Sequence, residues 1–378
     1  MDKIITVGIP AYKAQKHISD LLSSIQIQTV RELVKVVISN DNPGDKYDKI
    51  VANYPDLEIK VIDCKENGGP GVARQRILDQ CDTDWITFCD ADDIFLTPFA
   101  IESLLKGIGP NVIEVQSPFC QEIQEPNPQG IRMMPRNDIG HPWVFGRLYN
   151  AKFLKDSGIQ FGKQRAMEDG QLNWEVRMTI EGSPLQINVI NTPTYLWRTG
   201  SEHSITRIGI KENDGMPLYN FDLCQVGATA AAINAIKFCK KKNPFNGNIL
   251  RFTVEMMIGQ YFTYIECLGK KPLFAEQNLF NAKRMYHSVY KEVESQISDE
   301  IINNLYTMQM AGKSAELIGI IPEITFFDFM KKVKEEPYGG KEEFDKIRAE
   351  LPEWVTALDK KSGVLGDEGY IYTEEEDK

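Results

Sequence analysis

The chain has 378 residues, which is enough for one large domain or two ordinary ones, and its 42 % hydrophobic and 26 % charged residues are typical of a folded globular protein. Its formal net charge of −11 argues against binding to bare nucleic acid, because phosphate binding depends on lysine and arginine. The sequence has no signal-peptide core, and no apolar segment approaches the roughly 20 residues of a membrane span, so we expect no transmembrane segment.

The first ninety residues alternate between strand and helix patterns. Apolar runs rich in β-branched residues predict strands, and apolar residues at helical spacing predict helices between them. The predicted strands are 4–10, 33–39, 57–63 and 85–89, and the predicted helices are 18–25, 45–54 and 70–81. This alternation indicates βαβ units, hence an α/β fold with a mostly parallel sheet and helices on both faces. In such sheets ligands bind beyond the carboxyl ends of the strands.

The pattern changes twice further along the chain. Between about 110 and 205 it becomes irregular, with Pro-rich loops and short strands such as 185–190. Helical patterns then cover 219–242, 249–271 and 272–296, and shorter helical segments continue towards residue 358. We predict three parts: an α/β domain over 1–206, an all-helical C-terminal domain over 207–365, and a solvated acidic tail over 366–378.

The seven cysteines are scattered along the chain and form no Cys-x-x-Cys pair. An odd, dispersed set argues against a disulfide framework and against a structural zinc site. It indicates a reducing compartment, so we expect free core thiols in a cytoplasmic protein.

Three aspartates, Asp90, Asp92 and Asp93, directly follow the fourth predicted strand. Crowded carboxylates at the end of a buried strand repel one another, which is a poor arrangement for stability alone. Carboxylates on a short loop are the usual ligands of Mg²⁺ or Mn²⁺, and Mg²⁺ typically binds one or two carboxylates plus substrate phosphates. This spacing lets one carboxylate reach a metal ion while another reaches a ribose or base. An acidic surface loop is the alternative interpretation of these three residues alone.

Six segments carry further motifs in a fixed order. They are TVGIPAYKAQKHISDLLSSIQIQT (6–29), VVISNDNPGD (36–45), NGGPGVARQRIL (67–78), ITFCDADDIFLTP (86–98), WVFGRLYNAKFLKDSGIQF (143–161) with the following Glu168-Asp169, and YLWRTGSEHSIT (195–206). Together they resemble the family 2 glycosyltransferases, the large inverting group with the GT-A nucleotide-diphospho-sugar fold. The resemblance covers about residues 3–206 and leaves the helical region outside. It implies transfer of a sugar from a nucleotide-diphosphate donor, expected to be UDP-linked, to an acceptor hydroxyl.

The resemblance implies a set of donor-binding residues. They are Pro10, Ala11, Tyr12, Asp41, Arg74, Asp90, Arg198 and Ser204. Asp41 would accept a hydrogen bond from the ring NH of a uracil-type base, in a pocket lined by residues 10–12. Asp90 would face the ribose or base, and Arg74 would lie near the nucleotide or the acidic loop. Arg198 and Ser204 would contact the diphosphate or close a loop over it.

A divalent cation, Mn²⁺ or Mg²⁺, is implied as well, because negative charge grows on the departing pyrophosphate. Asp92 would be its principal ligand in this D-x-D type of motif. Asp93 would be an outer ligand or a residue that orients the loop. His203 would add an imidazole, although a lone histidine is more often a hydrogen-bonding residue.

Inversion needs one general base that deprotonates the acceptor hydroxyl. By resemblance this base is Asp169, with Glu168 beside it as a candidate acceptor ligand. Without the motif, the acidic pair would be interpreted as a favourable charge effect at a helix N-terminus. Trp143 would either stack on a sugar face or pack in the core.

The chain departs from the family pattern at two positions. These departures affect the identity of the expected donor more than the expected activity. Asn40-Asp41 replaces a pair of aspartates, and Gln75 replaces the asparagine that usually follows Ala73-Arg74. A catalytically weak sugar-nucleotide-binding or scaffold protein is one alternative function. A sugar-nucleotide pyrophosphorylase is another, but it would need a Gly-rich turn after the first strand, where this chain has GIPAYKAQKH. The acceptor is open among glycans, wall polymers, proteins and modified nucleobases, and the C-terminal helices are a candidate surface for homo-oligomerisation.

Overall fold

The computed structural model describes residues 3–126, 129–137, 141–164, 166–198, 218–242, 247–268, 272–313 and 324–350. The chain divides into two compact units. The α/β unit consists of Met1–Lys163, Glu168–Val176 and Gly182–Ser204, and the helical unit consists of Gln164–Met167, Arg177–Glu181 and Ile205–Lys378. The predicted boundary after residue 206 and the predicted acidic tail 366–378 lie outside the described residues, so both stay predictions.

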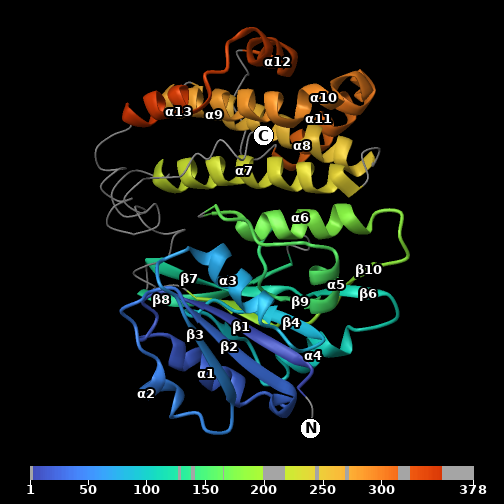
Figure 1. Cartoon of the computed structure of the whole chain (residues 1–378). Helices are drawn as coiled ribbons and strands as arrows, with labels where there is room; N and C mark the ends of the chain where they lie inside the picture. Colours follow the sequence, from blue (N-terminus) through green and yellow to red (C-terminus); the bar gives the residue numbers. More distant parts are fainter. Residues whose placement is uncertain are drawn as a thin grey trace. The chain divides into compact units, whose positions relative to one another are not determined.

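A seven-stranded sheet with the order β10-β6-β9-β4-β1-β2-β3 forms the centre of the α/β unit (Figure 1). Its strands are β1 (Ile5–Ala11), β2 (Val34–Asn40), β3 (Glu58–Asp63), β4 (Trp85–Phe88), β6 (Val112–Gln116), β9 (Arg147–Asn150) and β10 (Gln186–Val189). Neighbouring strands among β1 to β4 are parallel, as are β6 and β10, whereas β9 runs antiparallel between β4 and β6. The predicted α/β fold with a mostly parallel sheet is confirmed.

Helices cover both faces of this sheet. On one face, α1 (Ile18–Gln26) buries the predicted apolar side chains in the same cluster as Ile5, Val7 and Ile9 of β1. On the other face, α3 (Pro70–Asp79) packs against β1 and β2, and a Cβ added to Gly8 would lie 2.8 Å from Ile77 of α3. The remaining helices of the unit are α2 (Asp48–Val51), α4 (Ala100–Lys106), α5 (Ala151–Asp156) and the part of α6 (Glu168–Ile180) that precedes Arg177.

The prediction of a helix over 45–54 was wrong in its length. Only Asp48–Val51 is α-helical. Residue Asp45 uses its carboxylate in the loop after β2, and Pro55 disfavours helical geometry at the residue before it.

A second sheet has the order β5-β11-β7-β8, and all its strands except β5 come from the region that the sequence pattern left irregular. Its strands are β5 (Ile94–Phe95), β7 (Phe119–Pro126), β8 (Gln129–Arg136) and β11 (Tyr195–Trp197). Strand β11 is antiparallel to β5 and parallel to β7, and β7 and β8 form an antiparallel hairpin. Because β5 begins directly after Asp93, this pairing places β11 beside the acidic loop.

The second unit is helical, as predicted for the C-terminal region. Its helices are α7 (Leu218–Lys242), α8 (Gly247–Leu268), α9 (Pro272–Met285), α10 (Lys291–Val293), α11 (Asp299–Lys313), α12 (Phe326–Glu335) and α13 (Gly340–Ala349), with a π-helical turn at Tyr286–Tyr290. A capping box formed by Thr325 and Asp328 fixes the start of α12. None of the helices in the described ranges is long and apolar enough to cross a membrane.

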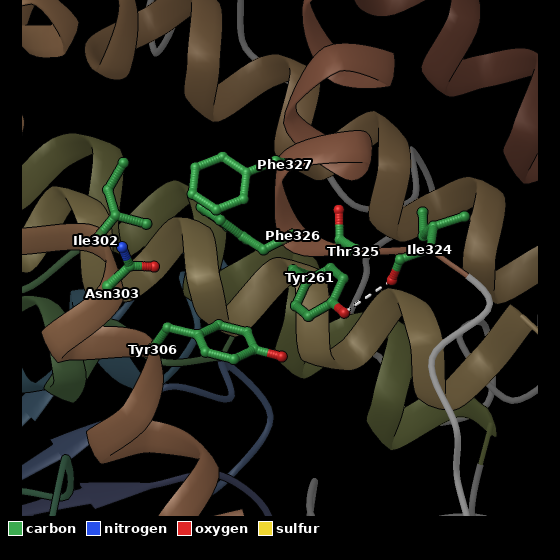
Figure 2. A pocket seen from close by; sticks show the side chains of 8 residues that line it. All are labelled: Tyr261, Ile302, Asn303, Tyr306, Ile324, Thr325, Phe326 and Phe327. Carbon is green, nitrogen blue, oxygen red and sulfur yellow. Dashed lines mark hydrogen bonds between the residues drawn. The ribbon is translucent and has the colours of Figure 1, made fainter. Parts of the chain in front are cut away.

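An apolar pocket of about 390 Å³ lies within the helical unit, between side chains of α8, α11 and the start of α12 (Figure 2). It is lined by Tyr261, Ile302, Asn303, Tyr306, Ile324, Thr325, Phe326 and Phe327. The Tyr261 hydroxyl, marked by the dashed line in Figure 2, donates a hydrogen bond of 2.9 Å to the carbonyl of Ile324. None of the predicted donor or catalytic residues that the structure describes lines this pocket.

Candidate active site

Several of the predicted donor residues lie at or just after the carboxyl ends of the parallel strands. Ala11 ends β1 and pairs in register with Asn40, which ends β2 and pairs in turn with Asp63 of β3. Strand β4 ends at Phe88 and leads into the acidic loop. Since parallel strands end at one edge of the sheet, residues far apart in sequence meet at this edge.

Asp41 organises the loop that leads into α3. Its Oδ1 accepts hydrogen bonds from the backbone N–H of Gly68 (3.0 Å) and from Nη1 of Arg76 (2.8 Å), and its Oδ2 accepts one from the N–H of Gly69 (2.7 Å). Gly69 has φ +86°, a left-handed conformation that glycine adopts without strain. The buried Asp41 carboxylate therefore sets the start of α3, and its contact with a base stays a prediction.

Asn40, the departure from a paired aspartate, ties three segments together. Its Nδ2 donates to Oδ1 of Asp63 (2.7 Å) and to the carbonyl of Asp45 (3.2 Å). The carboxylate of Asp45 in turn accepts a hydrogen bond from the backbone N–H of Lys13 (2.9 Å). An amide can donate and accept at once, which a carboxylate cannot, so Asn40 suits this position. Sequence reasoning missed Asp45, although the turn-forming run NDNPGD pointed to an ordered loop.

The acidic loop is held from strand β11. The hydroxyl of Tyr195 donates a 2.5 Å hydrogen bond to Oδ2 of Asp93, and the backbone N–H of Arg198 donates a 2.7 Å bond to its Oδ1. Burial raises the pKa of the Asp93 carboxyl well above its ordinary value, and the neighbouring Asp92 and Asp90 raise it further. Both oxygens of Asp93 thus accept hydrogen bonds from the protein. Such contacts are typical of a residue that orients the loop. Asp92 is half-buried on the same loop.

Arg74 bridges the acidic loop and the acidic pair. Its Nη2 donates a 2.5 Å hydrogen bond to Oδ1 of Asp90, and its Nη1 donates to Oε1 of Glu168. Burial by itself lowers the pKa of this guanidinium, but Asp90, Glu168 and Asp169 outweigh burial and hold the pKa above its ordinary value. Arg74 is therefore a fixed positive charge between two groups of carboxylates.

Glu168 and Asp169 open helix α6, and both are buried. Oδ1 of Asp169 accepts a 2.8 Å hydrogen bond from the N–H of Gly170. Burial raises the pKa of both carboxyls, and the charge of Arg74 opposes that effect at each of them. The pair is thus arranged to hold a proton more readily than exposed carboxylates do, which suits a residue that accepts one.

The first turn of α3 approaches this pair closely. A Cβ added to Gly71 would lie 2.1 Å from the carbonyl oxygen of Gly162 and 2.9 Å from Cγ of Glu168. Glycine at position 71 therefore allows α3, which carries Arg74, to pack against the start of α6.

An aromatic cluster stands behind the Tyr195 ring. Tyr195 stacks on Phe145 with ring centroids 4.5 Å apart, and Phe145 stacks on Trp143 at 5.4 Å. The guanidinium of Arg147 holds the loop of this cluster, because its Nε donates a 2.8 Å hydrogen bond to the carbonyl of Trp143 and its Nη1 pairs with the fully buried Glu114. Sequence reasoning missed Arg147, Glu114 and Phe145. Trp143 is partly buried against the core, which agrees with the interpretation that this side chain packs in the core.

The other predicted donor residues are placed as follows. Pro10 and Ala11 end β1, and the ring of the adjoining Tyr12 lies 4.9 Å beneath Nζ of Lys13. Nη1 of Arg198 contacts Asp20 of α1 at 2.7 Å. Ser204 and His203 lie outside the described residues.

The carboxylates suit a cation that is shared with a substrate. In the part of the chain that the structure describes, no three His, Cys, Asp or Glu side chains form a group able to hold a metal ion by themselves. Asp93 is engaged by Tyr195 and Arg198, and one oxygen of Asp90 is engaged by Arg74. A Mg²⁺ or Mn²⁺ ion bound by one or two carboxylates plus substrate phosphates needs no such cage, and Asp92 with the exposed part of Asp90 fits that mode of binding.

Comparisons with known proteins find glycosyltransferases among the relatives of this chain. Residues 6–164 match the family model described as glycosyl transferase family 2. The poly(ribitol-phosphate) β-N-acetylglucosaminyltransferase TarS of Staphylococcus aureus is 34 % identical over 214 residues, which is 52 % of this chain and 36 % of that protein. The glycosyltransferase GlyA of Streptococcus pneumoniae is 28 % identical over 226 residues, 52 % of this chain and 31 % of that protein. The chain thus spans about a third of the length of these relatives.

A solved structure shows the same fold. The crystal structure of S. aureus TarS 1–349 in complex with UDP superposes with a TM-score of 0.55 at 18 % identity, and the match covers 80 % of this chain and 86 % of that one. At this identity the match shows a similar fold. Residues 6–164, almost all of them in the α/β unit, thus match glycosyl transferase family 2, and the fold is that of the GT-A glycosyltransferases.

Proposed function

We propose that this chain is a metal-dependent, inverting glycosyltransferase that moves a sugar from a UDP-linked donor to an acceptor hydroxyl. The observation that carries the proposal is the bridge made by Arg74, which contacts Asp90 of the acidic loop and Glu168 beside Asp169. The buried guanidinium of Arg74 thereby connects the carboxylates that we assign to donor binding with those that we assign to the acceptor.

The donor would bind at the carboxyl edge of the parallel strands. Residues 10–12 and Asp41 would surround the base, and the acidic loop lies at the end of β4. The similar fold of TarS 1–349 was crystallised in complex with UDP, which supports a uridine nucleotide as the first donor to test. A bound Mn²⁺ or Mg²⁺ would be held by Asp92 and the donor's diphosphate, and it would stabilise the negative charge that develops on the leaving group.

Asp169 would act as the general base. Its carboxylate would take the proton of the acceptor hydroxyl as that oxygen bonds to the anomeric carbon on the side opposite the leaving diphosphate. The configuration at that carbon is then inverted, and the carboxyl of Asp169 releases the proton afterwards. Burial raises the pKa of the Asp169 carboxyl, and the positive charge of Arg74 opposes this effect by favouring the ionised form that can accept a proton.

Glu168 would keep Arg74 in place and, by its position next to the base, contribute to acceptor binding. The acceptor itself is best found by a panel that includes poly(ribitol phosphate), because the relative TarS is a poly(ribitol-phosphate) β-N-acetylglucosaminyltransferase.

Calorimetric titration with UDP, with and without Mn²⁺, followed by assays of donor hydrolysis and transfer, tests the proposal. UDP-glucose, UDP-galactose and UDP-N-acetylglucosamine are the donors to compare. We expect Mn²⁺-dependent UDP binding and turnover of one donor. Binding without turnover across the whole panel would instead favour the sugar-nucleotide-binding scaffold. Light scattering of the same sample tests self-association through the helical unit.

A further inference from the structure

Strand β11 lies beside the acidic loop and holds it in place. Strand β11 pairs with β5, the strand immediately after Asp93, and the backbone N–H of Leu96 donates a 2.9 Å hydrogen bond to the carbonyl of Thr194. The acidic loop is therefore enclosed between β4 at one end and the β5–β11 pair at the other.

The hydroxyl of Tyr195 makes two contacts with this loop. It donates a 2.5 Å hydrogen bond to Oδ2 of Asp93, and it accepts a 3.3 Å bond from the backbone N–H of Asp90. Arg198, at the end of the same strand, donates its N–H to the other oxygen of Asp93. The first and last aspartates of the loop are thus held from one strand, on either side of Asp92.

Burial makes these contacts costly to lose. Tyr195 is 1 % exposed and Asp93 is 3 % exposed. A buried carboxylate needs hydrogen-bond donors, and removing one of its two donors destabilises the present conformation of the loop. The Tyr195 ring itself is fixed by its stack on Phe145, at 4.5 Å and nearly parallel planes. The stacked ring therefore fixes the position from which the hydroxyl contacts the loop.

We propose that Tyr195 is a positioning residue that holds the acidic loop in the conformation in which Asp92 and Asp90 can meet the diphosphate and cation of the donor. This inference rests on the proposed function. In it, Tyr195 affects the reaction indirectly, through its hydrogen bond to Asp93. Residues that orient the carboxylates of a metal site typically affect metal affinity or activity by about 10–100-fold.

The substitution Tyr195→Phe tests this role, because it removes the hydroxyl and keeps the stacked ring. Tyr54→Phe is the matched control: the Tyr54 hydroxyl donates a 2.7 Å bond to the carbonyl of Ser19 and contacts Ser23, in the same unit and away from the acidic loop. We expect Tyr195→Phe to raise the Mn²⁺ concentration needed for half-maximal UDP binding, and to lower kcat/KM, by about 10–100-fold. Tyr54→Phe should leave both values within about twofold of wild type, although it also loses buried hydrogen bonds.

Hydrogen exchange of the loop amides gives a readout that needs neither metal nor activity. The amides of residues 90–93 should exchange faster in Tyr195→Phe than in wild type and stay unchanged in Tyr54→Phe. Adding Tyr195→Phe to an Asp93→Asn variant should cost little more UDP affinity, because the partner of the hydroxyl has already been altered.

Exchange and Mn²⁺ requirement equal to those of Tyr54→Phe would overturn the positioning role while leaving the proposed function intact. A wild-type protein that neither binds UDP with Mn²⁺ nor transfers sugar would refute the proposed function, and the exchange data would still decide whether Tyr195 holds the loop.

Discussion

Arg74 donates a hydrogen bond to the carboxylate of Glu168 inside the α/β unit, where each of the two side chains is only 6 % exposed. Breaking a buried pair by removing one partner leaves an uncompensated charge, which typically costs about 3–5 kcal/mol. We therefore expect Arg74→Met to lower the free energy of unfolding by about that amount in urea titrations at about pH 9, where Glu168, with a pKa of about 8, is ionised in the folded protein.

A double-mutant cycle separates this pair from general packing. Glu168→Gln in the Arg74→Met background should restore much of the lost stability, since the buried charge is then removed. Lys152→Met, which breaks an exposed pair with Asp156, is the control and should change little. Stability of Arg74→Met equal to that of the control would contradict the buried bridge.

The same carboxylate predicts how stability varies with pH. Burial and the charge of Asp169 raise the pKa of Glu168 from 4.5 to about 8, so the folded protein holds this proton more tightly than the unfolded chain does. The stabilising effect of protonated Glu168 is complete below pH 4.5 and is lost as the pH rises through the folded value. Urea titrations from about pH 5 to 8 should therefore show wild type losing stability relative to Glu168→Gln. A pH-independent difference between the two proteins would exclude a raised pKa at Glu168.

Asp169→Asn tests the general base. We expect UDP binding to persist and transfer to fall by about 10²–10⁴-fold, because an amide cannot accept the hydroxyl proton. Asp156→Asn, an exposed change on α5, is the control for altered net charge. Single-turnover transfer rates and UDP titrations of both variants give the result. Activity of Asp169→Asn within tenfold of wild type would remove Asp169 from this role.

Metal removal tests the acidic loop directly. We expect EDTA to abolish transfer and added Mn²⁺ to restore it in wild type, because the charge of the departing diphosphate needs a counter-cation. Asp92→Ala should stay inactive at any Mn²⁺ concentration, whereas Asp82→Ala, at an exposed carboxylate paired with Lys35, should behave as wild type does. Turnover that is insensitive to EDTA would overturn the metal dependence.

Local sequence patterns predicted the first four strands of the sheet well. The spacing of Ile18, Leu21, Leu22 and Ile25 appears as the buried face of α1, and the Pro-Gly pair at 70–71 marks the start of α3. Such features depend on residues that are close together in the chain, so they leave a local signature.

The support of the site is less visible in the sequence. The bond from Tyr195 to Asp93 joins residues that are 102 positions apart, and the pair of Arg147 and Glu114 joins residues 33 apart. Strand pairings over such distances have no local periodicity, which is why the second sheet and the antiparallel β9 were not predicted. The assigned roles of Asp92 and Asp169 came from the motif resemblance, and they stay predictions until the variants are measured.

The place of β9 between β4 and β6 leaves one edge of β4 unpaired during part of translation. During translation β4 emerges early, but its free side is closed only by Arg147–Asn150, which emerges several seconds later at ordinary rates of synthesis. Throughout that interval an apolar strand presents open backbone groups, a ready template for pairing with another chain. Ribosome-bound intermediates that end before β9 are therefore the species that chaperones need to shield.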